Sequence, residues 1–153
     1  MNMEKLPIKI YSLREGQIPS YSKAGDAGCD LRAYLPDGPV TLKPFERALI
    51  PTGIHIQLVP GYEAQVRPRS GLALKHGISV LNTPGTIDSG FTNQIGVILI
   101  NMSNEDFVVN DRERIAQLVI AKHETAEFIP VQSLDEFEKT ERGMGGFGHT
   151  GTD

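Results

Sequence analysis

Two adjacent residues, Arg69 and Ser70, combine side-chain types that bind anions. They stand at the start of a short stretch, Gly71–His76, that we predict as a helix ending at Gly77. The start of a helix presents free backbone N–H groups and the positive end of the helix dipole, which together favour an anion. The pattern is therefore compatible with an anion site. Taken alone, however, it favours the alternative that Ser70 only caps the helix.

A second group of anion-binding types lies near the end of the chain. Arg142, His149 and Thr150 flank a glycine-rich run whose one aromatic residue is Phe147. Backbone N–H groups of such a run can wrap an anion, whereas a plain glycine-rich terminus is more often a disordered tail. Residues 143–148 match G-x-G-x-x-G, but no strand precedes them and no helix follows, which excludes a dinucleotide fold.

Three acidic residues and one cysteine complete the candidates. Asp88 lies in the stretch 83–91, which we predict as a hairpin, just after a strand and just before a glycine turn. Aspartates in such places usually form turns, and the same alternative applies to the nearby Asn82. Asp26 and Asp30 are a weak metal pair, because their segment is not clearly helical. One cysteine, Cys29, can form neither an internal disulfide nor a cysteine-based zinc site.

Short apolar or alternating runs separated by proline and glycine make up most of the chain, and these predict an all-β sandwich or barrel. The expected strands are 8–10, 40–42, 48–50, 54–58, 63–67, 78–81, 95–100, 107–109 and 115–121. The runs 95–100 and 115–121 are apolar on both faces and should be buried on both sides, one side being open to cover by another subunit. Ser133 should begin a helix of about two turns that reaches Thr140.

Size and charge narrow the classes of function. The 153 residues predict one domain, and a net charge of −4 with a pI near 5.6 disfavours a nucleic-acid partner. No run is apolar enough to span a membrane, and the start, 1–11, shows no signal peptide. With one cysteine, a reducing, cytoplasmic location is the expectation.

Taken together and in order, five segments resemble the motifs of the trimeric dUTPases, the deoxyuridine triphosphate nucleotidohydrolases. The segments are 26–33 (DAGCDLRA), 67–73 (RPRSGLA), 82–94 (NTPGTIDSGFTNQ), 111–118 (DRERIAQL) and 142–151 (RGMGGFGHTG). They span nearly the whole chain. Each motif is moderately specific, but five in this order leave little room for coincidence. Phe91 stands where the family usually has tyrosine, and His149 stands where many members have serine.

The resemblance implies a fold, an assembly and a reaction. The fold would be an all-β distorted jelly roll, or β-sandwich-like barrel, with one short helix and a flexible Gly-rich C-terminal arm. Residues 1–132 would form the core, and residues 133–153 a C-terminal extension carrying the fifth motif. The chain would form a homotrimer with sites between subunits, use Mg²⁺, and hydrolyse dUTP to dUMP and pyrophosphate.

The resemblance also implies a role for each matching residue. Asp88 would hold the attacking water as general base, and Asp30 would hold the metal through water. The phosphates would be bound by Arg69, Ser70, Gly71, Gln117, Arg142, His149 and Thr150. The uracil and deoxyribose would be bound by Asn82, Gly85, Thr86, Ile87, Phe91, Phe147 and Gly148.

Two other functions remain open at this point. A dCTP deaminase of the same fold would release ammonia, but Asp88 follows the dUTPase pattern. A nucleotide-sensing or scaffolding trimer without activity would be expected to have lost residues such as Asp88, Ser70, Gln117 and Phe147, and all four are present.

Overall fold

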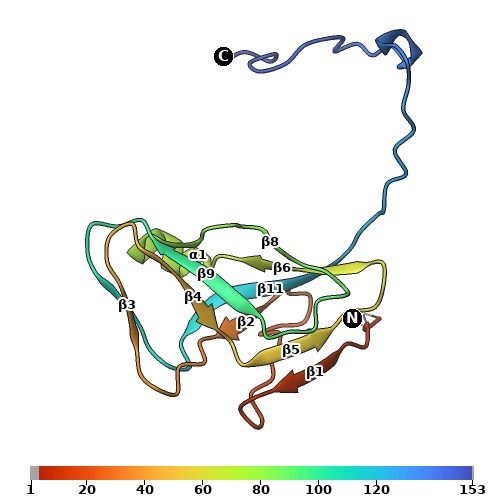
Figure 1. Cartoon of the computed structure of the whole chain (residues 1–153). Helices are drawn as coiled ribbons and strands as arrows, with labels where there is room; N and C mark the ends of the chain where they lie inside the picture. The colour runs from red at the N-terminus through yellow and green to blue at the C-terminus, as the bar shows by residue number, and fades with distance from the viewer. Residues whose placement is uncertain (1–3, 153) are drawn as a thin grey trace.

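The computed structural model of the chain describes residues 4–152. Residues 1–3, in the segment expected to lack a signal peptide, and residue 153, at the end of the predicted arm, lie outside the described part. Figure 1 shows a body of strands with a long arm leaving it. No helix within residues 4–152 is long and apolar enough to cross a membrane.

Short strands build the body, as the alternating runs predict. They are β1 (Lys9–Ser12), β2 (Gly28–Arg32), β3 (Val40–Leu42), β4 (Arg47–Pro51), β5 (Ile54–Gln57), β6 (Tyr62–Arg67), β7 (Ile78–Val80), β8 (Gly85–Ile87), β9 (Gly96–Asn101), β10 (Phe107–Val109) and β11 (Arg114–Lys122). The prediction of an all-β, jelly-roll-like fold is confirmed. Of these strands, β2 was not predicted, because its sequence GCDLR carries too few apolar residues to alternate clearly, and β8 was predicted only as part of a hairpin.

Antiparallel pairing joins strands that are distant in the sequence. The larger sheets have the orders β2-β11-β6-β8 and β4-β9-β7, and β1 pairs with β5 and β10 with β3. The buried faces of the two larger sheets share one core, which includes Leu31 and Leu118 from the first and Ile50 and Leu99 from the second. One rigid core therefore holds every loop described below.

The prediction of a hairpin over residues 83–91 is wrong. The strand in this stretch, β8, pairs with β6 of the four-stranded sheet, whereas its neighbours in sequence, β7 and β9, pair with each other in the other sheet. The stretch therefore crosses between sheets. The course of the chain here depends on which strands pair with one another, and local turn signals do not reveal that pairing.

Within one chain, only β11 of the two strands expected to be buried on both sides is so buried, and cover of the second side of β9 by another subunit stays a prediction. In β11, Ile115, Ala116, Leu118 and Val119 are all buried, and a register shift against β2 falls between Arg114 and Ala116. Such a bulge puts adjacent residues on the same side of a strand. In β9 burial alternates, and one face is only half-buried.

The first helical segment is one residue longer than the cap signals predict, and the second is shorter. The helix α1 (Ser70–His76) begins at Ser70 itself, and the N-cap is Arg69, which makes no side-chain capping bond. Ser70 is therefore not the cap. Gly77 ends the helix in the left-handed conformation, as predicted. Ser133 caps a single 3₁₀ turn, η1 (Leu134–Glu136), and the expected second turn does not form.

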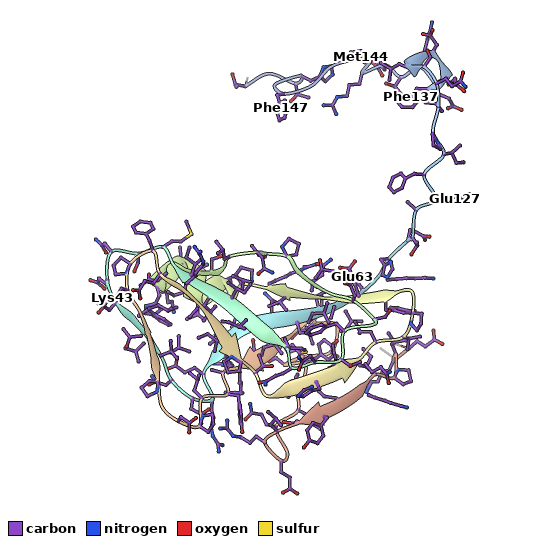
Figure 2. All side chains as sticks on the ribbon, viewed as in Figure 1. Lys43, Glu63, Glu127, Phe137, Met144 and Phe147 are labelled. Carbon is purple, nitrogen blue, oxygen red and sulfur yellow. The ribbon has the colours of Figure 1, made fainter. Side chains whose placement is uncertain are left out.

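The chain leaves the body after His123, whose backbone N–H donates to the carbonyl of Gly61 at 3.0 Å. We call residues 124–152 the arm. Within the described residues, the hydrogen bonds made beyond Glu124 all stay inside the arm. Figure 2 shows Phe137, Met144 and Phe147 on the part of the arm that stands clear of the sheets.

Candidate active site

A pocket of about 130 Å³ opens between β8 and β9. Five of the residues expected to bind the base and sugar line it: Asn82, Gly85, Thr86, Ile87 and Phe91. The remaining wall consists of Val66, Ile95, Gly96 and Ile98, which sequence reasoning identified only as strand residues. The structure thus brings one predicted group together in a small pocket whose lining is about equally polar and apolar.

Local geometry explains why Gly85 stands in this wall. Gly85 is buried and lies opposite Val66 in the β6–β8 ladder. A Cβ atom at Gly85 would lie 3.1 Å from the amide nitrogen of Asn82 and 3.5 Å from Cβ of Val66. A larger residue would therefore push Asn82 away from the pocket.

Asp88 follows directly after Ile87, at the end of β8, and is exposed. Its carbonyl accepts a hydrogen bond from the backbone N–H of Phe91 at 3.0 Å, which closes a turn. The turn uses the main chain: in the described part of the chain the Asp88 carboxylate accepts no hydrogen bond. The Asx-turn alternative is therefore not what the carboxylate does, and it is free to bind water.

The expected phosphate-binding residues of the body form a second group where β6 ends. Arg69 Nε donates to Asp30 Oδ1 at 3.1 Å, and Arg114 Nη1 lies 3.7 Å from Asp30 Oδ2. Two guanidinium groups thus flank a single carboxylate that is 37% exposed. Arg114 is a member of this cluster that sequence reasoning did not single out.

Ser70 and Gly71, in the first turn of α1, are both exposed. Among residues 4–152, no partner holds the Ser70 hydroxyl, and a Cβ on Gly71 would meet nothing within 4 Å. Gln117 lies behind them on β11, and its Nε2 donates to the carbonyl of Pro68 at 2.9 Å. The first turn of α1 is therefore open to a ligand while the segment before it is fixed.

The turn that precedes β11 is fixed by a third acidic residue, Asp111. The backbone N–H of Leu35 donates to it at 2.8 Å, and Arg14 Nη2 reaches both carboxylate oxygens at 2.8 and 3.0 Å. The Leu35 N–H, followed by Arg14, lowers the pKa of Asp111 below its ordinary value. By contrast, burial raises the pKa of the Cys29 thiol, so this lone cysteine is kept protonated.

The expected arm residues do not join either group within one chain. Arg142 donates from Nε to the carbonyl of Gly145 at 2.8 Å, inside the arm. Gly148 adopts the left-handed conformation, while His149, Thr150 and Phe147 are exposed. No hydrogen bond links these residues to the pocket in the described chain.

The two groups in the body also lie apart. Ile87, the neighbour of Asp88, is opposite Ala64 near the start of β6, whereas Ser70 follows the other end of that strand. At about 3.3 Å per residue, the part of β6 from Glu63, the residue beyond Ala64, to Arg67 spans roughly 13 Å, and Pro68 and Arg69 follow before Ser70. One chain therefore presents the base pocket and the phosphate group as two half-sites.

The described residues contain no cluster of side chains that could ligate a metal ion by themselves. Within residues 4–152, no group of three His, Cys, Asp or Glu side chains could hold a metal ion. Asp30 is the acidic side chain beside the phosphate group, and it has lone pairs beyond those directed at Arg69 and Arg114. This donor set fits an ion held mainly by a ligand's phosphates and by water, and does not fit a protein cage.

Comparisons with known proteins bear on the whole of this arrangement. The dUTPase family model matches residues 14–151. The chain is 48% identical to the deoxyuridine 5'-triphosphate nucleotidohydrolase of Fusobacterium nucleatum subsp. nucleatum, over 97% of this chain and 99% of that protein. The chain belongs to the dUTPase family. The matched range includes all five motif segments. The residues before Arg14 lie outside the match and carry none of the motifs.

Solved structures resemble this dUTPase over most of its length. The Staphylococcus bacteriophage 80alpha dUTPase, solved with dUPNHPP, is 26% identical, covers 97% of this chain and all of its own, and has a TM-score of 0.84. A dUTPase variant of phage phi11 of S. aureus, described for its coordination of a structural Mg(II) ion, is 22% identical and covers 86% of this chain and all of its own. Its TM-score of 0.75 supports the fold.

Proposed function

We propose that this dUTPase hydrolyses dUTP to dUMP and pyrophosphate, with Asp88 as the general base. The observation that carries the proposal is the pocket between β8 and β9, which Ile87 and Phe91 line. Asp88 lies between these two residues in the sequence, is exposed, and has a carboxylate without a hydrogen-bond partner among the described residues. The family and its nucleotidohydrolase relatives support the reaction. The product dUMP would supply thymidylate synthesis, and removal of dUTP would keep uracil out of DNA.

In the proposed mechanism, Asp88 accepts a proton from a water molecule that attacks the α-phosphorus. A new P–O bond forms to the water oxygen, the bond from the α-phosphorus to the bridging oxygen breaks, and pyrophosphate leaves. A positioned base typically contributes about 10²–10⁴-fold to the rate. Because phosphoryl transfer depends mostly on position and charge, the remaining residues have to hold the phosphates.

The phosphates would be held by donors of the second half-site. Ser70 and Gly71 offer an exposed hydroxyl and backbone N–H groups at the start of α1, and Arg69 adds a positive charge beside them. Gln117 and, from the arm, Arg142, His149 and Thr150 would complete the set. Asp30 would hold Mg²⁺ through water, and the bound ion would supply positive charge against the triphosphate.

The pocket would read the base and the sugar. Asn82 and backbone groups near Gly85 would pair with the uracil edge, and the small volume would exclude the 5-methyl group of thymine. Phe91 lines the pocket and would pack against deoxyribose, leaving no room for a 2′-hydroxyl. Phe147 would stack on the uracil from the arm, with Gly148 beside it.

A homotrimer would bring the half-sites together. A site within one chain would leave Asp88 and Ser70 toward opposite ends of β6, with roughly 13 Å of strand between them, too far for one nucleotide's α-phosphate to meet both. The arm also carries apolar side chains that need cover: Phe128 is 88% exposed, Ile129 80% and Phe147 111%. We propose that the arm, including the extension 133–153, closes on a neighbouring subunit of a cytoplasmic trimer.

The experiment is a pyrophosphate-release assay over dUTP, UTP, dTTP and dCTP, with ammonia measured in parallel. We expect pyrophosphate from dUTP, little from the other three, and no ammonia. Ammonia from dCTP would instead identify a deaminase. Asp88→Asn should lose turnover by at least about 100-fold while binding dUPNHPP with nearly unchanged affinity. Undiminished hydrolysis by this variant would refute the assignment of the base.

A further inference from the structure

Gly28, the first residue of β2, leaves space for the end of one particular side chain. A Cβ atom on Gly28 would overlap Oε1 of Gln117 and would lie 3.2 Å from its Cδ. Gly28 is not among the glycines with positive φ, so an alanine could adopt the same backbone conformation. Its small size, and not its conformational freedom, is what the structure uses here.

Strand register explains why these two residues meet. In the β2–β11 ladder, Gln117 is opposite Asp30 and Val119 is opposite Gly28. Gln117 and Gly28 are therefore diagonal neighbours on one face, within reach of a long side chain. Gln117 lies over the glycine and from there donates its Nε2 hydrogen to the carbonyl of Pro68 at 2.9 Å.

Pro68 and Arg69 form the whole connection between β6 and α1. Gln117 holds the first of these two residues through its carbonyl, and Asp30 holds the second through the Arg69 guanidinium. The Arg69 carbonyl in turn accepts the N–H of Ala73 at 3.0 Å in the first turn of α1. The direction in which Ser70 and Gly71 face is thus determined by side chains of β2 and β11.

We propose that Gly28 is a positioning residue for dUTP hydrolysis, which acts by orienting the Gln117 amide against the segment before Ser70. A methyl group at residue 28 would displace Oε1 of Gln117, and because the displaced atom is the end of a flexible side chain, the fold would stay intact. The Pro68 carbonyl would lose its donor, and the start of α1 would lose its fixed position. This inference rests on the proposed function, since it assigns Ser70 and Gly71 to the phosphates.

A double-mutant cycle tests the proposal on the full-length protein. Gly28→Ala should lower kcat/KM for dUTP by roughly tenfold and raise the Kd for dUPNHPP by a similar factor, as expected for one lost hydrogen bond, while the thermal midpoint falls by no more than about 5 °C. Gln117→Ala should lower kcat/KM by at least as much. In the Gln117→Ala background, Gly28→Ala should cost less than about twofold, because its target is already absent.

A second measurement does not depend on activity. A two-dimensional ¹⁵N–¹H spectrum should contain a Gln117 side-chain amide signal, identified by its loss in Gln117→Ala, that shifts and exchanges faster with solvent in Gly28→Ala. A full tenfold loss in both backgrounds, a thermal midpoint that falls by more than about 10 °C, or an unmoved amide signal would each overturn the proposal. If the unaltered enzyme released no pyrophosphate from dUTP, the proposed function would fail, and the amide signal would still report on the Gly28–Gln117 contact.

Discussion

Replacing Asp111 should destabilise the fold in a pH-dependent way. This carboxylate joins three parts of the chain: the segment after β1 through Arg14, the segment after β2 through Leu35, and its own turn before β11. Arg14 also stacks over the ring of Tyr34, with its guanidinium carbon 4.9 Å from the ring centre. Asp111→Ala removes the shared partner, while Asp111→Asn keeps an oxygen for the Leu35 N–H and removes only the charge.

The magnitude follows from the bonds that are lost. The Asp111 side chain is 31% exposed, so solvent screening limits the ion pair with Arg14 to about 1 kcal/mol. Leaving the Leu35 N–H without its acceptor costs a further 1–2 kcal/mol, approximately. We expect Asp111→Ala to lose about 2–3 kcal/mol, a fall in Tm of roughly 5–10 °C, and Asp111→Asn to lose about 1 kcal/mol.

The pH dependence follows from the lowered pKa of Asp111. An unfolded aspartate has a pKa of about 3.9, so at acid pH the unfolded state binds this proton first. The stabilisation is therefore complete above about pH 5 and disappears as the pH falls through the lowered folded-state pKa. The difference in stability between the unaltered protein and Asp111→Asn should be constant from neutral pH to about pH 5 and then shrink.

Urea unfolding at a fixed protein concentration, repeated at several pH values, measures these differences. Asp111→Asn is the matched control, because it preserves shape and one acceptor. A loss below about 0.5 kcal/mol for Asp111→Ala would contradict the reasoning, since that is the range of ordinary surface substitutions. A gap that widened toward acid pH would contradict the direction of the pKa shift.

Three further predictions concern the core and the arm. Asn101 is fully buried, and its side-chain amide forms hydrogen bonds with the backbone of Leu42, Ser103 and Glu105. Asn101→Ala should therefore lower the free energy of unfolding, measured with urea, by about 2–4 kcal/mol. An unchanged free energy would contradict this. A chain ending at Thr140 should keep the unfolding midpoint of the body and the proposed trimer but lose more than about 100-fold in kcat. Near-normal turnover would exclude a role for the arm. Limited proteolysis should cut the arm readily in the free enzyme and slowly in the presence of dUPNHPP and Mg²⁺. The reason is that only a ligand that retains its phosphates offsets the entropy lost when the glycine-rich segment becomes ordered. Equal rates of cleavage would refute this.

Local sequence patterns predicted most of the strands, because a strand with one buried face shows its period of two directly. Val40–Leu42 and Phe107–Val109 have the predicted bounds. The patterns failed to predict a strand where pairing with a neighbouring strand, and not alternation, stabilises it. β2 was missed because a glycine, a cysteine and two charged residues fill it, and its stability comes from the ladder with β11.

Residue types and their order were also enough to find the candidate site. Asn82, Gly85, Thr86, Ile87 and Phe91 were assigned together before any fold was known, and they line one pocket. Turn signals could not show that Ile95 and Ile98 close the same pocket, because these residues come from the adjacent sheet. A cap signal likewise could not show that Arg69 is the N-cap and that Ser70 is left open.

The sequence by itself determined the all-β class and the family and gave the candidate site residues, because alternation and motif order are properties of the chain alone. Only the tertiary structure decided that Asp88 and Ser70 lie at opposite ends of β6, that Asp30 is flanked by Arg69 and Arg114, and that Gln117 lies over Gly28. These facts depend on strand register and side-chain packing between residues far apart in the sequence, where no local pattern can record them.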